Sequence, residues 1–309
     1  MMPELHWPLS DSQRKEPRPL RRLDQGLRDH GFLRLEVPDF DWHRLHLVFT
    51  GSRQFFTQSM AEKRLFGYQS ASENFGYQGV SEEALDPASG QFDAKEAFTM
   101  RNIRQHSGPL ESWPSAEFQR LMIAFYEQCF ELMASITSSI AVIAGLPEDY
   151  FQSRLSGENV TLRLLRYPAA TSSSAEADQV LAGEHTDYGL LTLLFQDGAP
   201  GLEVQDREGV WQLVPAVANR VVVNVGDLMQ RWTNDAYPST LHRVRQQGNA
   251  VDRYSVAFFA DPNSNVEVTP WPTFVTAEKP ARYQTILSGE HIQAKLEASH
   301  RPLLSAGLE

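Results

Sequence analysis

Residues 185–197 read HTDYGLLTLLFQD, so a histidine and an aspartate two positions apart lead directly into an apolar run. Residues with this spacing on an extended strand point to the same side, which predicts that His185 and Asp187 chelate one metal ion. His242 follows later in the chain, after another apolar segment. Two imidazoles and a carboxylate can fill one face of an octahedral ion and leave the opposite positions open. We therefore predict a mononuclear metal centre on these three residues.

A second pair with the same spacing is Arg253-Tyr-Ser255, shortly after His242. A guanidinium and a hydroxyl on one strand face suit the carboxylate of an organic acid. A His-x-Asp tripeptide alone is weak evidence, and the reversed motif Asp41-Trp-His43 has no downstream partner. The prediction of an anion-binding site beside the metal therefore depends on the combination of His185 and Asp187 with His242 and the Arg253–Ser255 pair.

Some neighbouring residues allow two interpretations. Asn224 and Asp227 could orient a metal ligand, although turn formation around Gly226 explains them equally simply. Ala257 and Phe259 share the predicted strand face of Arg253, where they could line a pocket or pack in the core.

Composition indicates a folded protein that acts on small molecules. The chain has 309 residues, of which 41% are hydrophobic, and its formal net charge is -11. This acidic balance argues against nucleic acid as the principal partner, because binding phosphates needs a concentrated basic surface. No stretch is long and apolar enough to predict a membrane span, so we expect no membrane association.

The single cysteine, Cys129, excludes an intrachain disulfide and a cysteine-rich metal site. It lies in an apolar helical run and is expected to be a buried small side chain. The first 25 residues contain several prolines and charges and no apolar signal region. These features predict a cytoplasmic protein, and they leave the oligomeric state open.

The first half of the chain favours helices. We predict helices over residues 20–30, 42–65 and 115–144, a strand over 32–37, and a loop over 67–92 that could border a substrate channel. The helix over 115–144 is the clearest, because apolar residues recur at steps of three and four from Leu121 to Ile143. Ser115 is its expected cap, and Gly145 with Pro147 marks its end.

The second half changes to short apolar runs divided by turn residues, which predicts strands over 161–167, 190–195, 201–204, 210–214, 220–225, 242–245 and 254–260. Residues 169–182 are rich in serine and alanine and indicate an exposed loop, while 283–299 favour a C-terminal helix. Many short strands with few intervening helices are typical of an antiparallel barrel or a double-sheet jelly roll. Either arrangement would bring His185 and His242 together.

These motifs resemble the isopenicillin N synthase-like branch of the Fe(II)/2-oxoglutarate-dependent dioxygenases. The matching segments are residues 185–197, 224–234, 239–244 and 253–255, with weaker similarity at 31–32, 55–56, 93–98 and 166–168. The resemblance covers most of the chain and is specific for the family rather than for a substrate. It implies a mostly β fold with flanking helices, in which a double-stranded β-helix (jelly roll) core follows a helix-rich N-terminal region. We expect one domain over 1–309, with the helix-rich region at 1–155, the core, which carries the metal site, at 156–265 and a C-terminal strand and helix cover at 266–309.

The resemblance also implies a function. It places Fe(II) on His185, Asp187 and His242, with 2-oxoglutarate as cosubstrate on Arg253 and Ser255. Tyr167 matches a family position near a bound carboxylate, whereas Leu165 stands where many plant members carry asparagine. The expected reaction is oxidation of a C–H bond of a small organic substrate by O2, by hydroxylation, desaturation or cyclisation, with release of succinate and CO2.

No residue beyond the metal ligands is expected to act as an acid or base, and two alternatives to this function remain open. One is an isopenicillin N synthase-type Fe(II) oxidase that uses the Arg-x-Ser pair for its substrate and needs no 2-oxoglutarate. The other, less favoured, is a non-catalytic metal-binding jelly-roll module. The sequence leaves the identity of the substrate open.

Overall fold

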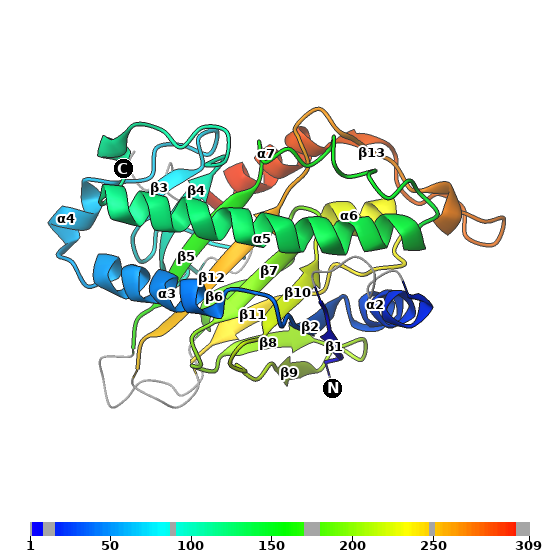
Figure 1. Cartoon of the computed structure of the whole chain (residues 1–309), viewed down its shortest axis with the longest axis horizontal. Helices are drawn as coiled ribbons and strands as arrows, with labels where there is room; N and C mark the ends of the chain where they lie inside the picture. The colour runs from blue at the N-terminus through cyan, green and yellow to red at the C-terminus, as the bar shows by residue number, and fades with distance from the viewer. Residues whose placement is uncertain (1, 9–15, 87–90, 170–179, 247–250, 301–309) are drawn as a thin grey trace.

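Two β-sheets that face each other across a pocket form the centre of the computed structural model, which describes residues 2–8, 16–86, 91–169, 180–246 and 251–300 (Figure 1). The larger sheet contains, in order across it, β1 (Glu4–His6), β2 (Phe32–Glu36), β10 (Val221–Val225), β7 (Leu191–Gln196), β12 (Arg253–Ala260), β5 (Thr161–Tyr167), β4 (Glu96–Arg101) and β3 (Phe75–Gln78). The smaller sheet contains β6 (Val180–His185), β11 (His242–Arg245), β8 (Leu202–Gln205) and β9 (Trp211–Leu213). A separate pair is β13 (Glu267–Val268) with β14 (Ile286–Leu287).

Neighbouring strands are antiparallel except β1 and β2. This double-sheet arrangement confirms the predicted mostly β fold with a jelly-roll core and flanking helices.

The described helices are α2 (Pro17–His30), α3 (Trp42–Phe56), α4 (Met60–Arg64), α5 (Ala116–Ile143), α6 (Asp227–Trp232) and α7 (Ser288–His300), with 3-10 turns at Leu110–Ser112 and Pro272–Phe274. The longest, α5, lies across the larger sheet (Figure 1). It confirms the clearest helix prediction, because Ser115 accepts a hydrogen bond from the backbone N–H of Phe118 and Gly145 follows the helix with a φ of 71°. Its predicted apolar stripe is buried from Phe125 to Ile140.

The alternation of residues along β12 divides the interior into two parts. Val256 and Phe258 belong to the main hydrophobic core, which also contains the buried hydrophobic residues of α2, α3 and α5. Ser255, Ala257 and Phe259 point to the other face and line the pocket between the sheets. One face of the larger sheet therefore packs against the helices, and the other face lines the pocket.

Some predicted elements were wrong. The helix expected over 42–65 is two helices, because Ser59 begins a new one with a capping box in which it exchanges hydrogen bonds with Glu62. The loop expected over 67–92 contains β3, and β1, β4, β6 and α6 were not expected. The loop expected over 169–182 gives way to strand at Val180, and residues 170–179 lie outside the described ranges.

The larger sheet joins both halves of the sequence. Strands β1 to β4 come from the N-terminal region, and two of them pair with strands from the second half: β2 with β10, and β4 with β5. The expected divisions at residues 155 and 265 remain a prediction. None of the described helices has the length and apolar character required to cross a bilayer.

Candidate metal centre and active-site pocket

The three predicted metal ligands meet at the end of the smaller sheet. His185 is the last residue of β6 and pairs across the sheet with His242, the first residue of β11. Asp187 lies just beyond β6, so the expectation of one strand for both members of the motif was wrong. Its carboxylate still faces both rings: Oδ1 lies 4.0 Å from Nε2 of His185 and 3.7 Å from Nε2 of His242. One donor atom from each residue lies within 4.8 Å of the others, close enough to share one ion.

Backbone carbonyl groups orient both histidine rings. Nδ1 of His185 lies 2.7 Å from the carbonyl oxygen of Gly183, and Nδ1 of His242 lies 3.2 Å from that of Thr240. A carbonyl oxygen can only accept, so each Nδ1 carries the proton and each Nε2 keeps a lone pair for a metal. Burial, reinforced by the neighbouring His242, lowers the pKa of His185 to about 4. The ring is therefore neutral at pH 7, as metal binding requires.

Two side chains fix the carboxylate of Asp187. The hydroxyl of Thr192 on β7 and the amide of Asn224 on β10 both donate to Oδ2 of Asp187. The backbone N–H of Asp227 donates to the carbonyl oxygen of Asp187 at 2.8 Å. The other carboxylate oxygen of Asp187, Oδ1, therefore faces the two histidine rings. The sequence left open whether Asn224 orients a metal ligand or forms a turn. The structure favours the first interpretation, because Asn224 lies within strand β10 and its side chain contacts Asp187.

Arg253 and Ser255 line the same pocket from β12 and are only 4% and 1% exposed. Nη2 of Arg253 donates to Gln196 at 3.1 Å, and the guanidinium lies 4.8 Å from the ring centre of Tyr167, its partner on β5. Nε and Nη1 of Arg253 and Oγ of Ser255 are buried and make no hydrogen bond to any described residue. Buried donors without partners are costly, and a carboxylate could accept hydrogen bonds from the guanidinium and from the hydroxyl of Ser255. The residues present therefore fit the far carboxylate of a dicarboxylic acid.

Apolar side chains surround these polar groups. From the larger sheet, Leu165, Leu194, Ala257 and Phe259 line the pocket, so Ala257 and Phe259 have the pocket-lining role that the sequence left open. The smaller sheet adds Leu202 and Val244. A mostly apolar cavity with a few polar groups is typical of small-molecule sites.

A second group of charged side chains, here called the charged wall, lines the pocket through Glu83, Lys95 and Arg163. The sequence did not predict that these side chains lie together. Glu83 accepts two hydrogen bonds from Arg163 of β5, at 2.7 and 3.2 Å, and pairs with Lys95 at 2.9 Å. Lys95 also pairs with Asp93. These residues come from three separate segments, and no short motif signals their contact. The expectation that residues 67–92 border a channel holds for Asn74, Glu83 and Leu85, which line the pocket.

Asp261, just after β12, adds a carboxyl group to the lining of the pocket. Burial raises its pKa to about 7. A Cβ placed on Gly189 would lie 1.6 Å from Oδ1 of Asp261, so only glycine fits between the metal-binding turn and this carboxyl group. The close approach connects β12 to the turn that carries Asp187.

Helix α7 covers the pocket through Ile292 and Leu296, in agreement with the expected C-terminal cover helix. Asp227 holds it in place: its carboxylate lies 2.9 Å from Nζ of Lys295 and 3.7 Å from Nε2 of His291. Asp227 thus joins the cover helix to the backbone of Asp187.

Comparison with known protein families gives two matches along the chain. Residues 159–262 match the 2OG-Fe(II) oxygenase superfamily, and residues 6–117 match the N-terminal region of non-haem dioxygenases described from morphine synthesis. The first match contains all six of the predicted metal- and carboxylate-binding residues.

Relatives and solved structures agree with these matches. A 2-oxoglutarate-Fe(II) type oxidoreductase, ppzD of Metarhizium rileyi, is 31% identical over 89% of this chain and 84% of its own length. The proline hydroxylase buaE of Petromyces alliaceus is 33% identical over 77% of this chain and 79% of its own. The crystal structure of a full-length Neurospora crassa protein in complex with alpha-KG and 5-formyluracil superposes with a TM-score of 0.84 at 31% identity, covering 95% of this chain and 96% of that one.

Proposed function

Because the chain belongs to the isopenicillin N synthase-like branch of the Fe(II)/2-oxoglutarate-dependent oxygenases, we propose that His185, Asp187 and His242 bind its iron. The protein is a non-heme Fe(II) dioxygenase that uses 2-oxoglutarate as cosubstrate and oxidises a small organic molecule with O2. The main support for this assignment is that one donor atom from each of the three residues lies within 4.8 Å of the other two, inside the pocket.

Arg253 and Ser255 bind the far carboxylate of 2-oxoglutarate in this proposal. Their unpartnered donors lie in the same pocket as the metal ligands, and the ring of Tyr167 holds the guanidinium from one side. With 2-oxoglutarate, bound Fe(II) supplies the O2-dependent oxidation of a C–H bond, with release of succinate and CO2. The protein residues orient the reactants and exclude water, and no side chain is assigned as an acid or base.

The alternative of an oxidase without 2-oxoglutarate has less support. The relatives are named as 2-oxoglutarate-dependent enzymes, and the compared structure contains alpha-KG. A non-catalytic module has less support still, since the pocket combines three candidate ligands with unpartnered carboxylate-binding donors.

The substrate in this proposal is a small molecule that lies between the metal and the charged wall. The Neurospora crassa structures contain thymine or 5-formyluracil, and buaE is named as a proline hydroxylase, so compounds of similar size are suitable first candidates. We propose neither nucleic acid nor membrane as partner, because the net charge is -11. A cytoplasmic location is proposed from the single cysteine, which is buried and free.

The test is anaerobic reconstitution with Fe(II), followed by addition of O2 and 2-oxoglutarate and measurement of succinate. We expect slow formation even without the substrate, and its loss in His185→Ala and Arg253→Ala. His43→Ala is a matched control, because this exposed histidine belongs to the reversed motif at residues 41–43. Oxygen consumption that is independent of 2-oxoglutarate would favour the oxidase, whereas succinate formation retained in His185→Ala would contradict the metal assignment.

A further inference from the structure

We propose that Lys295 on α7 is a positioning residue for the metal ligands, so that docking of this helix over the pocket and binding of the metal strengthen each other. The proposal rests on the proposed function, because it takes the metal to lie on His185, Asp187 and His242. It adds to that function a role for the cover helix in the affinity for the metal.

The first turn of α7 packs against the loop that follows β12. Oγ of Ser288 donates to the carbonyl oxygens of Pro262 and Asn263, both at 3.1 Å. The backbone N–H of Gly289 donates to the carbonyl oxygen of Ser264 at 3.1 Å, and a Cβ placed on Gly289 would lie only 2.7 Å from Cβ of Ser264. This end of the helix is therefore anchored, and contacts further along decide whether the rest of it stays docked.

The second half of α7 contacts two residues that adjoin Asp187, one in space and one in sequence. Nζ of Lys295 lies 2.9 Å from Oδ2 of Asp227, and the backbone N–H of Asp227 donates to the carbonyl oxygen of Asp187 at 2.8 Å. The same Nζ lies 5.5 Å from the ring centre of Tyr188, which directly follows Asp187. The side chains of Tyr188 and Ser299 also share a hydrogen bond. The position of the helix is thus felt on both sides of this metal ligand.

The carboxylate of Asp227 also reaches the segment of a second ligand. Its Oδ1 accepts a hydrogen bond from Oγ of Ser239 at 2.8 Å. The next residue, Thr240, has the carbonyl group that lies 3.2 Å from Nδ1 of His242 and orients that ring. Coupling between two sites needs contiguous contacts and an element with two arrangements. The contacts run from Lys295 to both ligands, and α7, anchored at one end, is the element.

Lys295 is the side chain that controls docking, because it makes the close contact to a mostly buried charge. The side chain of Asp227 is only 17% exposed, and a carboxylate in such a place needs a cation beside it. Nε2 of His291 lies 3.7 Å away, too far for a hydrogen bond. The apolar side chains that α7 gives to the pocket are Ile292 and Leu296. With so little apolar contact, the ion pair decides whether the second half of the helix stays in place.

A docked helix fixes Asp227 and, through it, the chain beside Asp187. Ligands that are oriented before binding hold a metal more tightly. By reciprocity, the bound metal favours the docked helix by the same factor. The cover is therefore tighter over a loaded pocket, where water has to be excluded, and looser over an empty one.

The first experiment measures the affinity for Mn(II), a redox-stable substitute for the iron. Lys295→Met removes the charge and keeps the apolar stem. We expect the Kd for Mn(II) to rise about 3- to 10-fold, a modest coupling that suits a partly exposed ion pair. Lys295→Arg should keep the wild-type affinity, because the guanidinium retains the ion pair. Lys279→Met is the matched control, since Lys279 lies outside α7 and does not line the pocket.

A double-mutant cycle assigns the effect to the ion pair. Asp227→Asn keeps an acceptor for Ser239 and the backbone N–H for Asp187 but loses the charge. It should weaken Mn(II) binding about as much as Lys295→Met does. The combined variant should show little further loss, because both changes remove the same interaction.

Hydrogen exchange on the unaltered protein tests the reciprocal effect. We expect Mn(II) to slow the exchange of amides at residues 292–299 about 3- to 10-fold in wild type, because undocking of α7 becomes rarer. In Lys295→Met the metal should have little effect on these amides, since the contact that transmits the coupling is absent. This readout on wild type does not depend on whether any variant folds.

An unchanged Kd for Mn(II) in Lys295→Met would overturn the inference, as would exchange in α7 that does not respond to Mn(II) in wild type. A loss in Lys295→Arg as large as in Lys295→Met would also overturn it. The proposed function would stand in these cases, provided that wild type binds one Mn(II) and His185→Ala does not. Absence of stoichiometric binding to wild type, or full binding to His185→Ala, would overturn the metal assignment and this inference with it.

Discussion

At the scale of single residues, the metal site depends on side chains that do not touch the ion. Asn224 and Thr192 donate to one oxygen of Asp187, so the other oxygen is presented to the histidines. Backbone carbonyl groups orient the rings of His185 and His242 in a similar way. They accept a hydrogen bond from Nδ1, so that Nε2 is free to bind the metal. Partners of this kind raise metal affinity because they remove the wrong orientations of the ligands before binding.

We expect Asn224→Ala to weaken Fe(II) affinity about 10- to 100-fold, because Asp187 loses a donor that fixes its carboxylate. Anaerobic titration with Fe(II), or with Mn(II) as a redox-stable substitute, measures the affinity. Asn219→Gly is the control, since Asn219 is exposed in a turn with a φ of 55° that glycine adopts readily. Equal affinities for wild type and Asn224→Ala would show that Asn224 does not orient the ligand.

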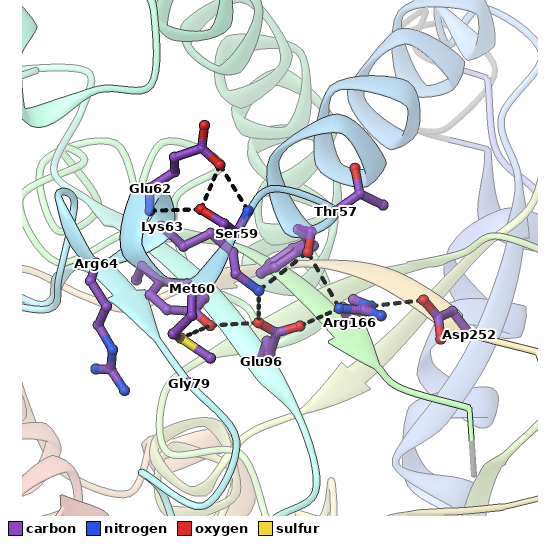
Figure 2. A network of polar contacts seen from close by, with 12 residues as sticks. Thr57, Ser59, Met60, Glu62, Lys63, Arg64, Gly79, Glu96, Arg166 and Asp252 are labelled. Carbon is purple, nitrogen blue, oxygen red and sulfur yellow. Dashed lines mark hydrogen bonds and ion pairs between the residues drawn. The ribbon is translucent and has the colours of Figure 1, made fainter. Parts of the chain in front are cut away.

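At the scale of elements, a chain of ion pairs joins the strands behind the carboxylate-binding residues. Figure 2 shows it running from Lys63 on α4 through Glu96 on β4 and Arg166 on β5 to Asp252, which precedes β12. Lys63 and Glu96 are almost fully buried, so their charges need each other. Arg166 and Asp252 directly adjoin Tyr167 and Arg253 in the sequence. Their side chains are ion-paired to each other, at 2.7 Å, rather than lining the pocket, so the contact holds β5 and the start of β12 together from outside the site.

Because of these ion pairs, we expect the stability of the protein to depend on pH. Burial alone would raise the pKa of Asp252, but the backbone N–H of Ala169 and the guanidinium of Arg166 outweigh it and lower the pKa below its ordinary value of 3.8. A carboxyl group with a lowered folded pKa contributes stability above its unfolded pKa and loses it as the pH falls through the folded pKa. The stabilising contribution of Asp252 should therefore be present at neutral pH and disappear in acid, below about pH 4.

We expect Asp252→Asn to be less stable than wild type at pH 7, and the difference to narrow as the pH falls from about 5 to 3. Urea unfolding at a series of pH values measures both free energies. Asp29→Asn, at an exposed position on α2, is the control and should show no such convergence. A difference that stays constant with pH would mean that the ion pair to Arg166 does not stabilise the fold.

At the scale of the whole molecule, the pocket is shared between parts of the fold that are far apart in the sequence. The histidines come from the smaller sheet, the carboxylate-binding residues from the larger sheet, and the cover from α7. Ligands that bind here should therefore hold the two sheets and the helix together. Because they bind the folded state only, they stabilise it in proportion to the logarithm of their concentration.

We expect Mn(II) and 2-oxoglutarate together to raise the melting temperature by several degrees, since a ligand at 100 times its Kd contributes about 2.7 kcal/mol. The increase due to 2-oxoglutarate should require the metal and be lost in Arg253→Ala, which a thermal unfolding series would measure. Asn219→Gly should retain the full increase. An equal increase in His185→Ala would contradict the placement of the metal on the three ligands.

Sequence patterns were sufficient for features that depend on neighbours along the chain. The strand over 161–167 and the helix capped by Ser115 were predicted because apolar periodicity and capping are local. His185, Asp187 and His242 were recognised by residue type and spacing, and the structure brings them together. Strands β3 and β6 were missed because glycine and polar residues in them weaken the alternation, and pairing with β4 and β11 supplies what the local pattern lacks.

The class of fold and the chemistry of the site could be predicted from sequence patterns alone, because apolar periodicity and ligand spacing involve residues that are close together in the chain. The distant side chains that complete the site could be identified only from the folded structure. The contacts of Glu83 with Arg163, of Asn224 with Asp187 and of Asp261 with Gly189 each join segments separated by 37 residues or more. Such contacts depend on strand register and burial, and these exist only once the two sheets have formed.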